Sequence, residues 1–95
     1  TNTETINWSI LKNRKLEIRT WKKGDSFQPL GMDGHQKISD FLINEKVDRL
    51  AKESQSVLTA DGEIVWVCGR RISDRVKLTK STAETAFLIR QPIHT

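Results

Sequence analysis

The apolar run Ile64-Val65-Trp66-Val67-Cys68 is the segment that most restricts how this chain can fold. Successive side chains of a strand point to opposite faces of a sheet, so Val65 and Val67 are expected on one face and the other three residues on the other. Both faces are apolar, which is typical of a strand covered by a packed layer on each side. The turn signal Asp61-Gly62 separates this run from residues 56–59 and predicts a tight hairpin. The core is therefore expected to be sandwich-like.

Two further strands and two short helices are predicted around this hairpin. Residues 14–21 alternate with period two, which predicts a strand with Leu16 and Ile18 facing the core and Arg19 on the solvent side. Helical spacing of apolar residues predicts one helix over residues 36–43 and a second over residues 46–53, the latter packing through Val47, Leu50 and Ala51. Residues 82–90 predict a final strand. These elements together predict an α+β domain.

The segment from residue 21 to residue 42 combines tight turns with positive charge. Gly24-Asp25 predicts one turn, and Pro29 with Gly31 predicts a second turn a few residues later. The glycines and the proline are interpreted as turn residues, and Asp25 as a group that binds turn amides or a nearby cation. The aromatic residues of the chain that fall on apolar faces are interpreted as core rather than as base-stacking platforms; they are Trp21, Phe41 and Trp66.

The length of 95 residues indicates one domain with a single modest core. Residues 1–10 are polar and are interpreted as a linker or leader remnant, with order beginning near Trp8 or Leu11, so that residues 11–95 form the domain. No signal peptide or membrane-spanning run is visible, and a soluble, cytoplasmic piece of a longer protein is expected. Cys68 lies in the apolar run and is expected to be a buried free thiol. With two histidines and one cysteine, no zinc-ligand spacing exists, and no metal is expected.

Positive charge is concentrated in two separate segments. Residues 10–23 hold six Lys or Arg and one Glu, and residues 69–80 hold five Lys or Arg and one Asp. Residues 33–63 carry seven acids against four bases. If the fold brings the two basic segments together, they form a positive face suited to an anionic partner.

Several motifs, in order and spacing, resemble one family. They are Arg-Thr-Trp-Lys-Lys-Gly-Asp-Ser-Phe-Gln-Pro-Leu-Gly-Met from Arg19, Lys-Ile-Ser-Asp-Phe-Leu from Lys37, Ile-Val-Trp-Val-Cys-Gly-Arg-Arg-Ile from Ile64, and Arg-Val-Lys-Leu-Thr from Arg75. They resemble the C-terminal domain of tRNA(Ile)-lysidine synthetases over about residues 15–90. The resemblance implies a compact β-sandwich-like fold with small helices, as in a domain of the phenylalanyl-tRNA synthetase β subunit.

The resemblance also implies a function and partners. The family's enzymes use ATP, with magnesium, to activate the wobble cytidine of an isoleucine tRNA and then attach free lysine. The catalytic domain, with a Ser-Gly-Gly-x-Asp-Ser phosphate loop, lies N-terminal to this module. No such loop occurs here, so the chain alone is expected to be inactive, with no catalytic residues and no cofactor of its own. The implied partners are tRNA(Ile), on the acceptor-stem side, and the catalytic domain of the same protein; the oligomeric state is left open, with a homodimer as one alternative.

Carried over by position, the resemblance implies a set of tRNA-binding cations, to which the basic turn adds Lys22. The full set is Arg19, Lys22, Lys23, Lys37, Lys52, Arg70, Arg71, Arg75 and Lys77. The family commonly has prolines at positions 48 and 56 and an arginine at position 52, where this chain has Asp48, Ser56 and Lys52. These departures affect the geometry of the second helix and any forked contact there.

The residues also allow plainer interpretations. Arg70, Arg71 and Arg75 could equally brace their loop by pairing with Asp40 or Asp74. A structural or protein-interaction module, supporting dimerisation or interdomain packing, is the alternative function. The two hypotheses differ in one structural requirement: residues 23–32 and 70–77 must lie on the same side of the fold for one nucleic-acid surface to include both.

Overall fold

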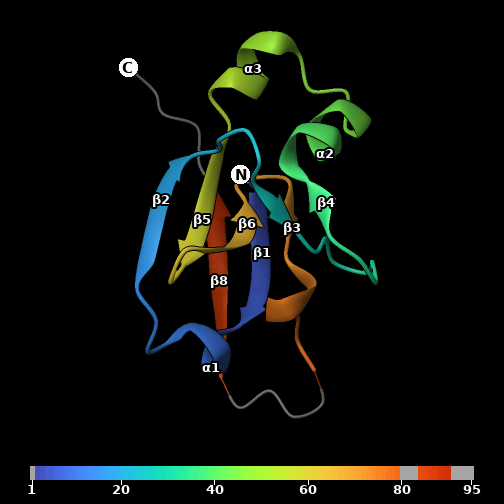
Figure 1. The fold of residues 1–95 in the computed structure, drawn as a ribbon. Helices are drawn as coiled ribbons and strands as arrows, with labels where there is room; N and C mark the ends of the chain where they lie inside the picture. The colour runs from blue at the N-terminus through green and yellow to red at the C-terminus, as the bar shows by residue number, and fades with distance from the viewer. Residues whose placement is uncertain (1, 80–83, 91–95) are drawn as a thin grey trace.

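The computed structural model describes residues 2–79 and 84–90, which form an α+β domain of three layers (Figure 1). The middle layer is an antiparallel sheet in the order β2-β5-β6-β7. Its strands are β2 (Leu16–Thr20), β5 (Ser56–Ala60), β6 (Glu63–Val67) and β7 (Arg71–Ile72). The antiparallel pair β1 (Asn2–Asn7) and β8 (Thr85–Arg90) forms a second layer. The third layer contains β3 (Ser26–Phe27), β4 (Gln36–Lys37) and α2 (Ile38–Asn44).

The middle sheet is apolar on both faces, as the sequence predicts. One face packs with Ile6 of β1 and with Leu11 of α1 (Trp8–Leu11). The other face packs with Phe27 of β3 and with the buried side of α2, including Phe41. Cys68 is buried and forms no disulfide with any described residue. The predicted α+β fold with a sandwich-like core is therefore confirmed.

The central hairpin is confirmed, but its second strand carries a bulge. Asp61 and Gly62 have φ angles of 50° and 86°, the left-handed conformation that a tight two-residue hairpin turn requires. In the register, Leu58 is opposite Trp66 and the next pair is Thr59 with Ile64. Val65 is therefore an extra residue, and it lies in the same core cluster as Trp66 while Val67 lies in the other. The predicted placement of Val65 and Val67 on one face is wrong, because a bulge breaks the alternation.

Both predicted helices form, but only α2 packs through buried side chains. The α2 helix buries Ile38, Phe41 and Leu42 as predicted. The α3 helix (Arg49–Glu53) is shorter than predicted and has no buried residue, and its Leu50 is 78% exposed. The predicted packing through Leu50 is therefore wrong. The helix is instead capped at its N-terminus by Asp48, whose carboxylate accepts a hydrogen bond from the Ala51 N–H at 2.9 Å.

The β2 strand forms where predicted but faces differently. Leu16 and Ile18 are 38% and 68% exposed, because β2 is the edge strand of the middle sheet and neither core cluster includes these side chains. Arg19, predicted on the solvent side, is only 31% exposed in its side chain and pairs with Asp25. The predicted orientation of this strand is wrong.

The N-terminal residues are part of the fold. Strand β1 pairs with β8 from Asn2 opposite Arg90 to Asn7 opposite Thr85, and Ile6 is fully buried. The prediction that order begins near Trp8 or Leu11 is therefore wrong, since residues 1–10 include a strand and part of α1. Of the predicted last strand, residues 82 and 83 lie outside the described residues. None of the described helices has the length and apolar character needed to cross a membrane.

Candidate nucleic-acid interface

The two motif loops lie against each other. Pro29 and Ser73 form an isolated antiparallel bridge, and the Leu30 N–H donates to the Ile72 carbonyl at 3.1 Å. The Gly31 N–H also donates to the carboxylate of Asp74 at 3.1 Å. Residues 23–32 and 70–77 therefore share one side of the fold, which is the arrangement that a single nucleic-acid surface requires.

Three of the nine predicted contact residues are neutralised by carboxylates. Arg19 pairs with Asp25 at 2.8 Å, Arg75 with Glu63 at 3.2 Å, and Lys77 with Asp74 at 3.1 Å. The hydrogen bond from Arg19 holds the pKa of Asp25 below its ordinary value, and the same bond raises the pKa of Arg19. A cation that already has a carboxylate partner gains less from a phosphate, because it must first leave that partner.

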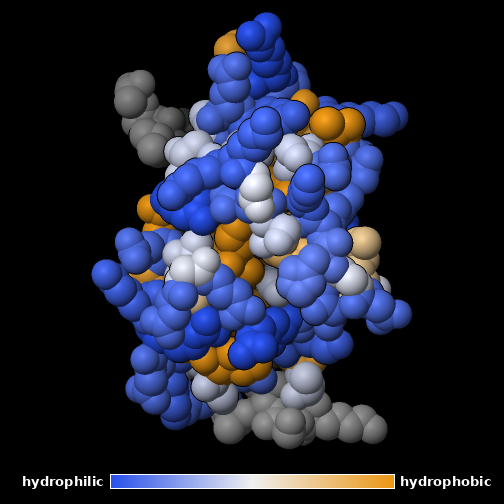
Figure 2. Space-filling view, viewed as in Figure 1, coloured by the Kyte–Doolittle hydropathy of each residue, from blue (hydrophilic) through white to orange (hydrophobic). Residues whose placement is uncertain are grey.

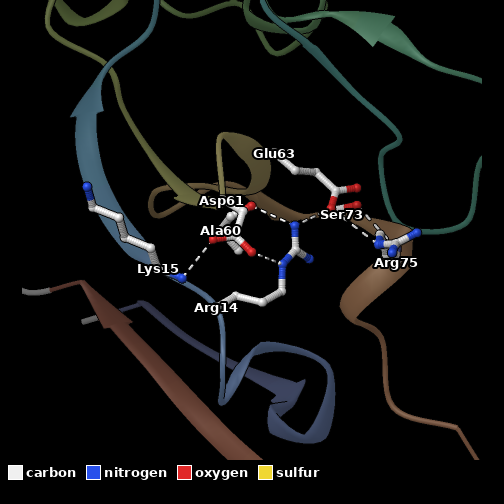
Figure 3. A network of polar contacts seen from close by, with 7 residues as sticks. All are labelled: Arg14, Lys15, Ala60, Asp61, Glu63, Ser73 and Arg75. Atoms are coloured by element: carbon white, nitrogen blue, oxygen red, sulfur yellow. Dashed lines mark hydrogen bonds and ion pairs between the residues drawn. The ribbon is translucent and has the colours of Figure 1, made fainter.

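Figure 3 shows that Arg75 belongs to a bracing network around the central hairpin. Arg14 donates to Glu63 at 2.9 Å, to Asp61 at 3.2 Å and to the Ala60 carbonyl at 2.6 Å. Arg75 approaches the same Glu63 carboxylate from the other side. Arg75 thus ties the loop after β7 to the hairpin, although neither acid that the sequence suggested as its partner is the one it binds.

The other six predicted cations have no ion pair within residues 2–79 and 84–90. We call this set the basic end; it consists of Lys22, Lys23, Lys37, Lys52, Arg70 and Arg71. The set comes from the loop after β2, from β4, from the end of α3 and from the residues at β7. Figure 1 places the β2–β3 loop, α2 and α3 at the same end of the molecule.

The loop after β2 is fixed by Asp25. The Asp25 carboxylate accepts a hydrogen bond from the Lys22 N–H at 2.7 Å, and the Asp25 backbone carbonyl accepts one from the Ile38 N–H at 2.9 Å. Lys37 lies beside this loop, because it is the register partner of Ser26 in the β3–β4 pair. The turn therefore holds the backbone of this part of the basic end, while the ammonium groups of Lys22 and Lys37 stay without a carboxylate partner in the described structure.

Gln55 positions the second part of the basic end. It is 7% exposed, and its carbonyl oxygen Oε1 accepts from Arg70 Nε at 2.7 Å while its Nε2 donates to the Cys68 carbonyl at 3.0 Å. The Gln55 backbone carbonyl accepts from the Trp21 N–H at 3.1 Å, and Trp21 Nε1 donates to the Lys52 carbonyl at 2.6 Å. Sequence reasoning missed Gln55, since a single glutamine before a strand carries no pattern.

Two of the cations lie over aromatic rings. The Arg71 guanidinium carbon is 5.7 Å from the centroid of Phe41, and Lys52 Nζ is 5.9 Å from the centroid of Trp21. A guanidinium that lies over a ring retains N–H groups at its edge for hydrogen bonds to an anion. These contacts orient the cations without neutralising them. They also agree with the interpretation of Phe41, which is buried, and Trp21, which packs on the core, as core residues.

The surface at this end is predominantly polar. Figure 2 shows hydrophilic residues over most of the region of α2 and α3, with apolar residues as small separate spots. Ile43 and Leu50, on α2 and α3, are exposed apolar residues of this region. Within the part of the chain that the structure describes, no group of three or more metal-ligating side chains comes together.

A family model for the TilS substrate C-terminal domain matches residues 16–88 of this chain. The chain belongs to this family. The matched residues include the loop after β2, both motif loops and most of β8, so the resemblance read from the motifs is confirmed.

Curated relatives agree with the family assignment. A tRNA(Ile)-lysidine synthase of Parabacteroides distasonis is 38% identical over 82% of this chain and 20% of its own length. The corresponding protein of Bacteroides thetaiotaomicron is 39% identical over 74% of this chain and 16% of its own length. The chain thus spans a fifth or less of the length of these relatives. A crystal structure of a TILS C-terminal domain superposes with a TM-score of 0.73 at 23% identity, covering 90% of this chain and 65% of that one, and shows the same fold.

Proposed function

We propose that this chain binds tRNA(Ile) on its acceptor-stem side and positions it for ATP-dependent lysidine formation at the wobble cytidine. The observation that carries the proposal is the basic end, in which six cations that form no ion pair with any described residue meet at one end of a TilS-family domain. The chemistry would belong to a catalytic domain of the same protein, with ATP and free lysine as substrates and magnesium accompanying the ATP. The role of this chain is binding and orientation.

The basic end suits the backbone of a double-stranded RNA stem. A-form RNA presents phosphates and 2′-hydroxyls across a wide, shallow minor groove, and proteins recognise it mostly by shape. Arg70 and Arg71 offer planar groups for forked contacts to phosphate, and Lys22, Lys23 and Lys37 act as point charges. Such contacts fix the register and orientation of a stem without reading its sequence. They would hold one end of the tRNA while the anticodon reaches the catalytic domain.

Binding of tRNA(Ile) to the chain tests the proposal, with heparin as an unrelated acidic polymer. We expect the tRNA to bind more tightly than heparin, and Arg70→Ala with Arg71→Ala to weaken tRNA binding by at least about tenfold, because two charged contacts are lost. The matched control is Lys12→Ala with Lys15→Ala, which removes the same charge from residues paired with Glu84 and Glu17. Equal losses in the two double variants, or equal affinity for heparin, would refute the proposal.

One observation favours a second candidate function, an interaction module. The edge strand β2 exposes Leu16 and Ile18 and has no neighbour on its outer side within the described residues. An exposed apolar edge strand is a surface on which another protein segment can pair. If this is the main role, Ile18→Lys will abolish a self-association or interdomain contact that is measured by sedimentation, and it will leave tRNA binding unchanged.

A further inference from the structure

A pocket of about 270 Å³ opens between β3, the start of β6 and the loop after β7. Phe27 and Ile64 contribute an apolar floor, since they are 2% and 5% exposed. Polar side chains surround this floor, among them Ser73, which is buried, and His35, which is exposed. An apolar floor with a few polar groups is the usual composition of a small-molecule site, and the volume is below the common range of about 300–1,000 Å³. The occupant must therefore be small.

The charges around the pocket are balanced, which restricts the chemistry of the occupant. Glu63 lies between Arg14 and Arg75, and Arg14 also binds Asp61. The two guanidinium groups and the two carboxylates of this network cancel (Figure 3). A buried anion would meet the Glu63 carboxylate and a buried cation would meet the two arginines, so neither is favoured. A neutral ligand fits this balance best.

Several polar atoms of the pocket have unused hydrogen-bonding capacity among the described residues. Arg14 and Arg75 both contact the Oε1 oxygen of Glu63, so its Oε2 oxygen is available as an acceptor. The Ser73 hydroxyl accepts from the Arg75 N–H at 3.2 Å and retains its own proton for donation. Gln28 donates through Nε2 to the Met32 carbonyl at 2.7 Å, which leaves its Oε1 available. The pocket thus offers both donors and acceptors around an apolar floor.

The location of the pocket relates it to the basic end. Ser26 lines the pocket and is the register partner of Lys37, and Arg71 lies two residues before the lining residue Ser73 in the chain. We propose that the pocket takes one unpaired nucleobase of the RNA whose stem lies on the basic end. A nucleobase is neutral, flat and carries donors and acceptors on one edge, and unpaired bases are the usual targets of specific RNA recognition. His35, at the exposed rim, stacks on the outer face of the base.

This inference rests on the proposed function but is tested separately from it. The chain, labelled with ¹⁵N, is titrated with the 5′-monophosphates of the four ribonucleosides and with ribose 5-phosphate, which lacks a base. We expect at least one nucleotide to shift the amide signals of Ser26, Gln28 and Ser73, and ribose 5-phosphate to leave them unchanged. His35→Ala should weaken this binding by about fivefold or more, and His35→Phe should retain it, because a stacking ring is kept. Ser73→Ala should weaken it by about threefold through the lost hydrogen bond.

Two results would overturn the inference. One is that no nucleotide shifts these amides, and the other is that ribose 5-phosphate shifts them as strongly as the nucleotides. Lys23→Ala serves as the control that separates the two proposals: it should weaken binding of tRNA and leave nucleotide binding unchanged. If the pocket fails while Lys23→Ala still weakens tRNA binding, the basic end stands and only the pocket is refuted.

Discussion

The side chain of Gln55 should be coupled energetically to Arg70. Gln55→Ala removes the acceptor of the 2.7 Å bond from Arg70 Nε and both donations from Nε2, to Ser56 at 2.9 Å and to Cys68 at 3.0 Å. Gln55 is only 7% exposed, so water cannot easily replace the lost hydrogen-bond partners. A neutral hydrogen bond contributes about 0.5–1.5 kcal/mol and one to a charged group about 1.5–3 kcal/mol. The free energy of unfolding should therefore fall by roughly 3–5 kcal/mol.

The coupling is measured by a double-mutant cycle of Gln55→Ala and Arg70→Ala, with the free energy of unfolding obtained from urea titrations. Arg70→Ala alone should cost about 1.5–3 kcal/mol, and the double variant should be more stable than the sum of the two losses predicts, by about 1.5 kcal/mol. Gln55→Glu gives a second check. It offers Arg70 a carboxylate but removes the hydrogen bond that Gln55 Nε2 donates to the Cys68 carbonyl, so it should also destabilise the fold. Losses that add to within about 0.5 kcal/mol would refute the coupling.

Three further predictions concern the turns, the core and acid stability. Gly62→Ala should destabilise the fold by about 1–2 kcal/mol, because Gly62 has a φ of +86°, a conformation that strains any residue with a Cβ atom. Gly34→Ala should be close to neutral, because Gly34 also lies in open space but has no positive φ. Urea titration of both variants checks this difference. Ile38→Ala should lower the free energy of unfolding by about 2–5 kcal/mol, because Ile38 is fully buried. Ile43→Ala, at a residue that is 60% exposed, should lower it by less than about 0.5 kcal/mol. Thermal unfolding of the two variants checks this difference. In the folded protein, the Arg19 guanidinium lowers the pKa of Asp25 from 3.8. The ionised carboxylate therefore stabilises the fold fully above pH 3.8, and this contribution is lost as the pH falls through the lower pKa of the folded state. Asp25→Asn should make the free energy of unfolding depend less on pH below about pH 4.

Local patterns in the sequence were sufficient for the central hairpin and for the buried side of α2, but not for the edge strand β2 or the N-terminal strand β1. The run from Ile64 to Cys68 and the Asp61-Gly62 turn determine a covered hairpin because burial and turn conformation depend on adjacent residues. Strand β1 was missed because its sequence is polar apart from Ile6, and its pairing with β8 joins residues more than seventy positions apart. The alternation in β2 was recognised, but its exposure depends on being the edge strand, which is a property of the sheet order.

The candidate site divides in the same way. The family motifs predicted where the cations occur in the sequence. The structure then divides them into those paired with a carboxylate and those of the basic end. Arg75 pairs with Glu63, twelve positions earlier in the chain, and this contact exists only because the loop after β7 folds back on the hairpin. Gln55 orients Arg70 through a contact across fifteen positions. Net charge along the sequence could not distinguish a bracing arginine from one available to a phosphate.

The salt dependence of tRNA binding tests most directly whether the basic end is the contact surface. Two double variants lose the same charge. Lys22→Ala with Lys23→Ala removes cations that have no ion pair among the described residues, and Arg75→Ala with Lys77→Ala removes cations paired with Glu63 and Asp74. Each lost phosphate contact reduces the slope of log K against log salt by about 0.9. The lysine variant should therefore reduce the slope by about 2, and the paired variant by less than about 1. Equal reductions in both variants would contradict the account, since they would show that only total charge matters.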